Sequence, residues 1–325
     1  MTAFIIRRLM QAVIVIFLMS VIVFFGVNVV GDPVYMLISP DMDQAEIERT
    51  IRNLGLDRPI WEQYFHFLKG AATGDLGKSF IFGEPALKLI LHHMPATLEL
   101  AFTSLIMAIV LGIPLGLFAG LYPDNVFSKG ILATSILGFS LPTFWVGLML
   151  IMLFAVVLGW LPSTGRGDTA VFLGIESSLF TWDGLTHIFL PALNLALLNI
   201  SLVIRLTRAG AREAMHQDYI KFARAKGLST RRVIFVHLLK NIMIPVVTVL
   251  GLEFGSLIAF SVVTETIFAW PGMGKLLIDA ILQLDRPIVV AYLMIIVAFF
   301  VVINLIVDIL YSILDPRVRL RDQGQ

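Results

Sequence analysis

The chain has 325 residues, of which 58% are hydrophobic and 14% are charged, and its mean hydropathy is +0.90. Soluble domains average about 45–50% apolar and about 25% charged residues, so this composition excludes an ordinary soluble globular protein. The net charge of +1 provides no global field to attract nucleic acid, and the absence of cysteine excludes disulfides and thiolate metal sites. The long apolar runs instead predict an all-α integral membrane protein.

Six apolar segments are long enough to cross about 30 Å of hydrocarbon. The first, 9–30, follows Arg7 and Arg8. It exceeds the apolar core of a secretory signal, which is about 7–15 residues, so we interpret it as a retained span. We expect a single transmembrane domain over residues 1–325. The remaining predicted spans are 97–121, 131–159, 186–206, 242–263 and 287–314.

The connection between the first two spans, residues 31–96, carries helical patterns of its own. Asp43 and Glu46 resemble a capping box at the start of a helix. Farther on, Trp61 and Tyr64 belong to an aromatic-rich run with helical spacing. We expect an amphipathic helix on the outer face, which either lies on lipid or serves as a platform for an external partner.

The stretch AATGDLGKS, residues 71–79, is similar to a phosphate-binding loop. That motif needs G-x-x-x-x-G-K-[ST] between a strand and a helix. Here Ala72 occupies the first glycine position, and no strand is predicted before it. We therefore expect no nucleotide site in this chain, and we find no pattern that predicts a catalytic residue, a metal site or a bound cofactor.

Lysine and arginine orient the predicted spans. If both termini are cytoplasmic, the inner segments carry 14 of these cations and the longer outer segments carry nine. The excess of cations in cytoplasmic loops is the usual rule, so it favours this N-in, C-in orientation. It places residues 207–241, between the fourth and fifth spans, in the cytoplasm.

Glycines and polar side chains interrupt the apolar spans. Gly112, Gly116 and Gly120 recur every four residues, a pattern that allows close helix packing. Polar or charged groups at membrane depth usually face a bundle interior or a cavity. They therefore line a translocation path or make buried structural hydrogen bonds, and both interpretations stay open. The candidates for the path are Glu253, Asn194, Asn199 and Ser256.

The stretch DYIKFARAKGLSTRRV, residues 218–233, is strongly basic. Tyr219, Phe222 and Ala223 share one face of a predicted helix, Gly227 is a typical residue after a helix C-terminus, and Ser229 is a typical N-cap. The pattern predicts a helix, a turn and a second helix. The segment is a topology signal alone, a helix on lipid, or a helix that fits the groove of a partner protein.

Several motifs together resemble the permease subunits of peptide, oligopeptide and nickel ABC importers, in particular the first permease of a dipeptide- or glutathione-type system. The resemblance covers the chain from Arg7 to Arg319 and depends on the joint order of the motifs. In chain order these are LGLDRPIWEQYFHFL, GDLGKS, LPSTGRG, DYIKFARAKGLSTRRVIFVHLLKNIMIPVVT, IFAWPGMGKLL and DPRVR.

This resemblance implies a type I ABC importer permease fold in the bacterial cytoplasmic membrane. It also implies the partners: a second homologous permease, two ATP-binding subunits that hold ATP and Mg, an extracytoplasmic substrate-binding protein, and membrane lipid. Nucleic acid is not among them. The substrates would be di- or oligopeptides or similar small solutes.

The resemblance further implies the roles of two segments. The cytoplasmic loop would couple to the ATPase, although only Ala223 and Leu239 match the EAA-x3-G-x9-I-x-L-P motif of the family when its glycine is aligned on Gly227. The implied outer gate comprises Phe268, Trp270, Pro271 and Gly272. The implied coupling residues are Tyr219, Ile220, Lys221, Phe222, Ala223, Arg224, Ala225, Lys226, Gly227 and Leu228.

The alternative is a stand-alone secondary transporter or channel for a small polar solute. Such proteins often contain internal repeats with paired broken helices. Residues 1–160 and 161–325 show no convincing repeat, which argues against this alternative.

Overall fold

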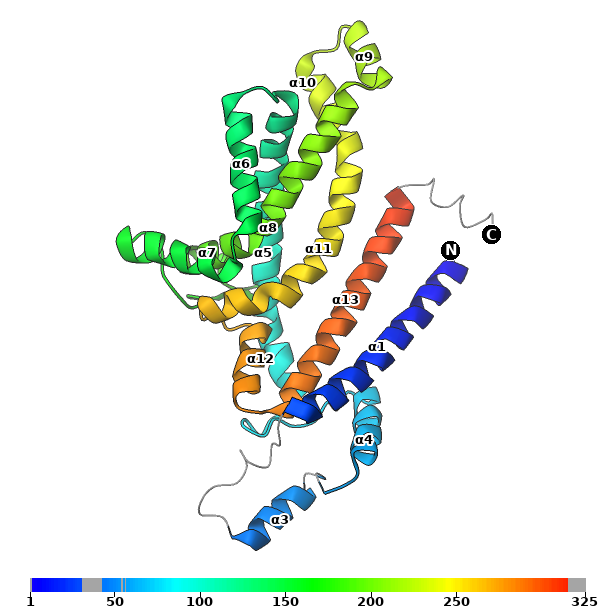
Figure 1. Cartoon of the computed structure of the whole chain (residues 1–325), viewed down its shortest axis with the longest axis vertical. Helices are drawn as coiled ribbons and strands as arrows, with labels where there is room; N and C mark the ends of the chain where they lie inside the picture. The colour runs from blue at the N-terminus through cyan, green and yellow to red at the C-terminus, as the bar shows by residue number, and fades with distance from the viewer. Residues whose placement is uncertain (1, 31–42, 54, 56, 315–325) are drawn as a thin grey trace. The chain divides into compact units, whose positions relative to one another are not determined.

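The computed structural model describes residues 2–30, 43–53, 55 and 57–314. Within this part of the chain, five helical segments are long and apolar enough to cross a membrane (Figure 1). They confirm five of the six predicted spans. The helices that form them are α1 (Thr2–Val30), α5 (Ala86–Leu121), α8 (Trp182–Met215), α11 (Leu239–Ile267) and α13 (Arg286–Leu314). Cations beyond residue 314, and the motif DPRVR that contains some of them, lie outside the described residues.

The predicted span 131–159 is broken into two arms, which together are also long and apolar enough to count as a candidate span. The chain forms α6 (Val126–Ser140) and then α7 (Thr143–Leu150), which continues as the π-helix η1 (Ile151–Val157), and the two arms meet at a bend of 111°. Leu141 has φ −83° and ψ 138°, an extended conformation. Pro142 imposes it, because a proline disfavours the α conformation in the residue before it.

By its internal contacts the chain divides into two compact units. Unit 1 comprises Met1–Thr97 and Pro271–Val301, and unit 2 comprises Leu98–Trp270 and Val302–Gln325. One boundary falls inside α5 and another inside α13, so the two units share helices.

In unit 2, α5 and α8 approach each other closely along the predicted glycine face. A Cβ atom on Gly112 would lie 2.7 Å from the Val203 side chain, and one on Gly116 would lie 2.7 Å from the Ile204 carbonyl oxygen. One on Gly120 would lie 2.8 Å from the Ala211 Cβ. The glycines are thus required for this helix contact, as the small-residue pattern predicts.

In unit 1, α4 (Ile60–Ala72) packs one face on α1 and turns the other outward. The Tyr64 hydroxyl lies 2.8 Å from the Ser20 hydroxyl of α1, and Tyr64 is buried. Trp61 and Phe65, on the adjacent face of the helix, are 60% and 67% exposed. This confirms the predicted amphipathic helix in the connection after α1. The unit also holds α3 (Gln44–Asn53), which begins after Asp43 as predicted, and α12 (Met273–Leu282).

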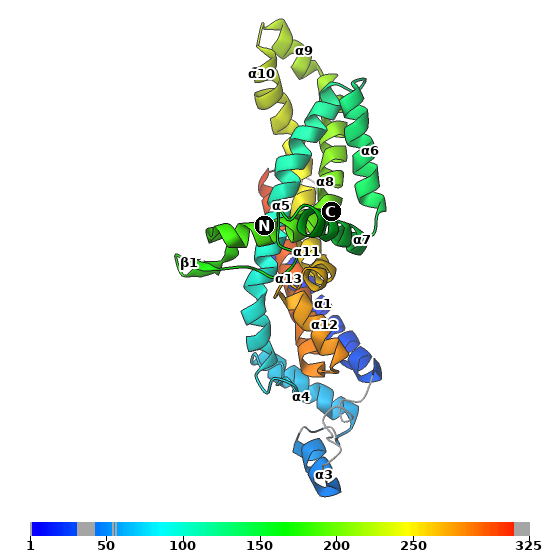
Figure 2. The same cartoon turned by 90° about the vertical axis from the view of Figure 1, so that its left-hand side faces the viewer.

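Between η1 and α8, unit 2 carries a small antiparallel hairpin. Strand β1 (Ala170–Phe172) pairs with β2 (Ile175–Ser177), and a 3-10 turn, η2 (Ser178–Phe180), leads into α8. Figure 2 shows β1 extending away from the long helices of this unit. Between α8 and α11 the chain forms α9 (Asp218–Ala225), α10 (Thr230–Arg232) and the π-helix η3 (Val233–Leu238).

Candidate functional site

The predicted coupling segment is a short helix anchored on the chain's own bundle. In α9, Ile220 is fully buried and Ala223 is 4% exposed, and both pack in one apolar cluster that includes Val233 and Leu238. Phe222 is 62% exposed and Tyr219 is 38% exposed. The predicted Tyr219–Phe222–Ala223 surface is therefore wrong as a single face. Ile220 and Ala223, three residues apart, share the buried face of the helix and anchor it. Tyr219 and Phe222 lie on its exposed face.

The end of α9 has the geometry that its sequence predicts. Gly227 has φ +76°, its N–H donates to the Arg224 carbonyl at 2.9 Å, and the Leu228 N–H donates to the Ala223 carbonyl at 3.3 Å. These two bonds form a Schellman motif, which glycine favours because its backbone reaches positive φ without strain. Ser229 takes the N-cap position of α10, but its side chain makes no capping hydrogen bond.

The exposed face of α9 combines cations with aromatic rings. The Lys221 ammonium donates to the Asp218 carboxylate at 2.9 Å. This hydrogen bond, and then the charge of Lys221, lower the pKa of Asp218 below its ordinary value. The Lys226 ammonium lies 4.6 Å from the centre of the Phe222 ring, a cation–π contact. The helix is therefore anchored on one face, and its exposed face carries both aromatic and basic side chains.

The predicted path residues do not all lie at the same level of the helices. Asn194 on α8 is 1% exposed, and its Nδ2 donates to the Thr264 hydroxyl of α11 at 3.0 Å. Its Oδ1 is buried and has no hydrogen-bond partner among the described residues. Asn199 is buried, whereas Glu253 and Ser256 are half-buried. Since Thr264 lies roughly three helical turns beyond Glu253, Asn194 and Glu253 lie at different levels of α11.

The two aromatic residues of the predicted gate are packed within unit 2, just after the end of α11. Phe268 and Trp270 are 1% and 0% exposed, while Pro271 is exposed and Gly272 is buried. The Phe268 carbonyl accepts a hydrogen bond from the Gly165 N–H at 2.9 Å. The aromatic side chains are thus structural anchors here, and their gating role stays a prediction.

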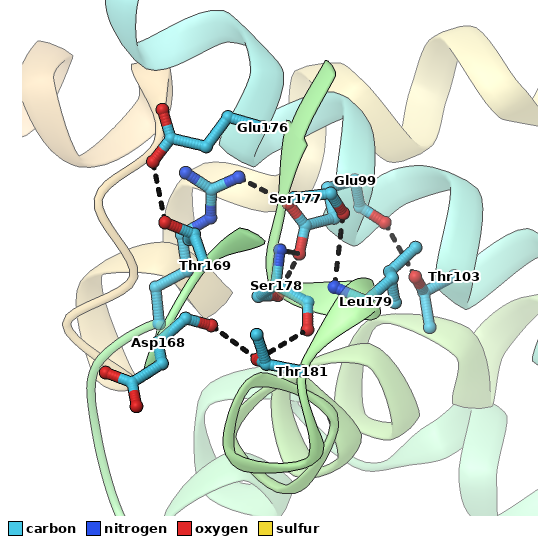
Figure 3. A network of polar contacts seen from close by, with 10 residues as sticks. Glu99, Thr103, Asp168, Thr169, Glu176, Ser177, Ser178, Leu179 and Thr181 are labelled. Atoms are coloured by element: carbon cyan, nitrogen blue, oxygen red, sulfur yellow. Dashed lines mark hydrogen bonds and ion pairs between the residues drawn. The ribbon is translucent and has the colours of Figure 1, made fainter. Parts of the chain in front are cut away.

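Sequence reasoning missed two arrangements of buried acidic residues in unit 2. Glu265, fully buried near the end of α11, accepts a hydrogen bond from the Ser261 hydroxyl at 2.8 Å. Near the start of the part of α5 that belongs to unit 2, the carboxylate of Glu99 accepts three hydrogen bonds (Figure 3). Its Oε2 lies 2.5 Å from the Arg166 guanidinium, and its Oε1 accepts from the Ser178 N–H at 3.1 Å and from the Ser178 hydroxyl.

The stretch similar to a phosphate-binding loop is a structural junction in unit 1. It follows the helix α4 rather than a strand. The Ser79 hydroxyl donates to the fully buried carboxylate of Asp285, which also accepts from the Phe80 N–H at 3.1 Å. The geometry therefore differs from that of a phosphate-binding loop, and the segment holds the start of α13 in place.

The long apolar helices and the close packing of α5 on α8 define a multi-pass membrane protein. The chain belongs to the family of binding-protein-dependent transport system inner membrane components. The family model matches residues 112–320, and a second model, for the N-terminal part of these membrane components, matches residues 1–101.

Characterised relatives match along their whole length. The di/tripeptide transport system permease protein DppB of Pseudomonas aeruginosa is 38% identical over 338 aligned residues, which cover 98% of this chain and 99% of the relative. The oligopeptide transport system permease protein AppB of Bacillus subtilis is 40% identical over 320 residues, with the same coverage. The glutathione transport system permease protein GsiC of Escherichia coli is 35% identical, again with 98% and 99% coverage.

A solved structure supports the fold. A chain of the inward-facing MetNI methionine ABC transporter aligns with a TM-score of 0.53, covering 70% of this chain and 97% of that chain at 16% identity. At this identity the likeness concerns the fold alone. The predicted ABC permease fold and the multi-pass location in a bacterial inner membrane are confirmed, and nothing supports a stand-alone carrier or channel.

Proposed function

We propose that this chain is one of two membrane-spanning subunits of an ATP-driven importer for short peptides, including glutathione-like peptides. The proposal is supported by the end-to-end match to relatives named for di/tripeptide, oligopeptide and glutathione transport. In this proposal an extracytoplasmic binding protein delivers the substrate, and ATP with Mg binds to two partner subunits. The test is uptake of a labelled dipeptide and of glutathione into proteoliposomes that contain this chain with its partner subunits.

The coupling of ATP hydrolysis to this chain would run through α9. The single observation that supports this role is the division of the helix into two faces. Ile220 and Ala223 seat it in the bundle, and Phe222 projects outward beside basic side chains. A rigidly seated helix transmits a displacement of its exposed face to the bundle, and an exposed aromatic side chain is a suitable anchor for the groove of a partner.

Replacing Phe222 with aspartate is expected to release the ATP-binding subunits while the protein stays in the membrane. Burial of a phenylalanine side chain contributes about 1.5–3 kcal/mol, so the recovered ATPase should fall roughly ten- to hundredfold. The measurement is co-purification of the ATP-binding subunits through an affinity tag on this chain. Phe222→Leu, which keeps an apolar side chain, should retain most of the association. Normal recovery with Phe222→Asp would eliminate α9 as the coupling helix.

Replacing Glu253 with glutamine is expected to slow transport without changing assembly. The substitution removes a half-buried charge from α11 and keeps the size of the side chain. Ionisable side chains inside membrane spans usually mark a substrate pathway, so we expect the initial uptake rate to fall by about tenfold. The control is Glu213→Gln, at an exposed acid near the end of α8. Unchanged uptake kinetics would assign Glu253 a structural role instead.

A further inference from the structure

The hairpin of unit 2 ends in an exposed apolar tip that the proposed transport function does not use. Residues 170–175, AVFLGI, contain no polar or charged side chain. Polar groups lie at the base of the hairpin instead, where the Thr169 hydroxyl donates to the Glu176 carboxylate at 2.6 Å. A hairpin in water usually alternates apolar with polar side chains, so this tip is not typical of a segment in water. Its large side chains are all at least 60% exposed: Val171, Phe172, Leu173 and Ile175.

The turn at this tip holds a leucine in a conformation that leucine rarely adopts. Phe172 pairs with Ile175, so Leu173 and Gly174 form a two-residue turn, and their φ angles are +51° and +80°. Such turns favour Asn-Gly, because both central residues need positive φ. The Cβ atom of a leucine makes this conformation strained. Since Leu173 is 87% exposed, packing within the described chain does not compensate for the strain, and a contact outside the chain would explain it.

The level of the hairpin in the membrane follows from α8. Residues 188–204 of this helix contain no ionisable side chain, and Asp183 and Arg205 lie on either side of them. These two residues are 22 positions apart, about 33 Å along an α-helix, close to the hydrocarbon thickness of about 30 Å. The first turn of α8 therefore lies at one boundary of the hydrocarbon. Ser178, just after the hairpin, is fully buried and donates to Glu99, so the base of the hairpin is fixed at this level.

The apolar tip is continuous with the outward-facing apolar side chains of α8. The ring centres of Phe172 and Phe180 are 5.5 Å apart, and Phe180 is exposed. Two residues later α8 begins, and its exposed apolar side chains recur at helical spacing: Trp182, Leu185 and Phe189. Tryptophan is enriched where spans meet the membrane–water boundary. The hairpin thus extends a surface that a membrane helix already presents to lipid.

The direction of the hairpin favours lipid over a soluble partner. Figure 2 shows β1 extending sideways from unit 2, across the direction of α5 and α8. A segment that reaches a soluble protein would continue along the helices, away from the membrane. A sideways segment stays at the level of the boundary, where its apolar side chains meet acyl chains and its polar base meets headgroups.

We propose that the hairpin tip, residues 171–175, inserts into the predicted outer leaflet of the membrane, with the side chains of Phe172 and Leu173 in contact with acyl chains. Contact with lipid also explains why an apolar residue occupies the strained position of the turn. The inference depends on the membrane location of the chain and not on the transported substrate.

The test is electron paramagnetic resonance of spin-labelled full-length protein in nanodiscs of phosphatidylethanolamine and phosphatidylglycerol. The chain has no cysteine, so Val171→Cys carries a single label beside the turn. We expect this label to collide with oxygen, which dissolves in lipid, and to lose most of its accessibility to a water-soluble nickel complex. Glu213→Cys, at an exposed acid beyond the other end of the apolar part of α8, is the aqueous reference. Equal nickel accessibility of the two labels would overturn the proposal.

A second pair of variants separates the fold of the turn from its contact with lipid. Asparagine adopts positive φ readily, so Leu173→Asn should keep the hairpin folded while it removes the apolar side chain. The label at position 171 should then gain nickel accessibility, whereas Leu173→Met, which stays apolar, should keep the label protected. Equal protection in both variants would contradict the role of Leu173.

Addition of the extracytoplasmic binding protein of the same system distinguishes the two kinds of partner. A label protected in nanodiscs without the binding protein supports lipid. A label that is accessible to nickel in nanodiscs, and becomes protected only when the binding protein is added, would identify a docking surface for that protein and overturn the assignment to lipid.

Discussion

Replacing Glu99 with alanine is expected to destabilise the folded protein by about 3–5 kcal/mol, because it leaves a largely buried arginine without its counter-charge. The side chain of Glu99 is 5% exposed and that of Arg166 is 17% exposed. Ser178 loses its acceptor as well. An unpaired charge in a buried site retains the full cost of its desolvation, whereas the intact pair offsets that cost. The measurement is thermal unfolding of the purified protein in detergent.

The control is Glu84→Ala, which breaks an ion pair on the surface. Glu84 and Lys88 are 3.0 Å apart, but their side chains are 47% and 71% exposed. Exposed pairs contribute about 0–1 kcal/mol, so this variant should unfold close to the wild-type temperature. The double variant Glu99→Leu/Arg166→Leu should recover part of the loss, since an apolar pair needs no counter-charge. Equal effects of Glu99→Ala and Glu84→Ala would contradict a structural role for the buried pair.

Replacing Gly116 with valine is expected to separate α5 from α8 and to lower the yield of folded protein sharply. A Cβ atom at this position would lie 2.7 Å from the Ile204 carbonyl oxygen and 2.8 Å from the Thr207 Cβ. The nearest of these atoms belongs to the backbone of α8, which cannot rotate away as a side chain can. Overpacking of a core costs about 1–3 kcal/mol or more, and we expect the upper end of this range.

Gly130→Val is the control for this substitution, because nothing lies within 4 Å of a Cβ atom at Gly130 in α6. The two variants have the same change in composition and helix propensity, so only the helix contact differs. Size-exclusion chromatography of the detergent-solubilised protein, followed by fluorescence, measures the folded fraction. Gly116→Ala should give an intermediate loss. A Gly116→Val protein that elutes and unfolds like Gly130→Val would contradict the close contact between α5 and α8.

The local properties of this protein follow from its sequence. The apolar runs predict five of the spans, because a helix of about 20 apolar residues satisfies its own backbone hydrogen bonds without water. The turn at Gly227 and the glycine face of α5 are predictable for a similar reason. Each depends on residues within a few positions of one another in one helix or turn.

Which face of each helix is buried was less predictable. The spacing of Tyr219, Phe222 and Ala223 describes one side of α9, but only the packing of Ile220 and Ala223 on Val233 and Leu238 reveals which stripe faces inward. Both stripes contain apolar side chains, so hydrophobicity alone does not distinguish them. In the predicted third span, Pro142 was visible in the sequence, but the size of the bend, 111°, is known only from the structure.

The buried polar contacts were decided by the tertiary structure alone. Glu99 and Arg166 are 67 positions apart, and Ser79 and Asp285 are 206 apart, so no local period relates them. The sequence by itself determined the membrane class, most of the spans and the helix–turn–helix, since these depend on local composition and spacing. Only the folded chain decided which charges are paired and which aromatic side chains are anchors, because a buried charge is stabilised by whichever partner the fold brings within hydrogen-bonding distance.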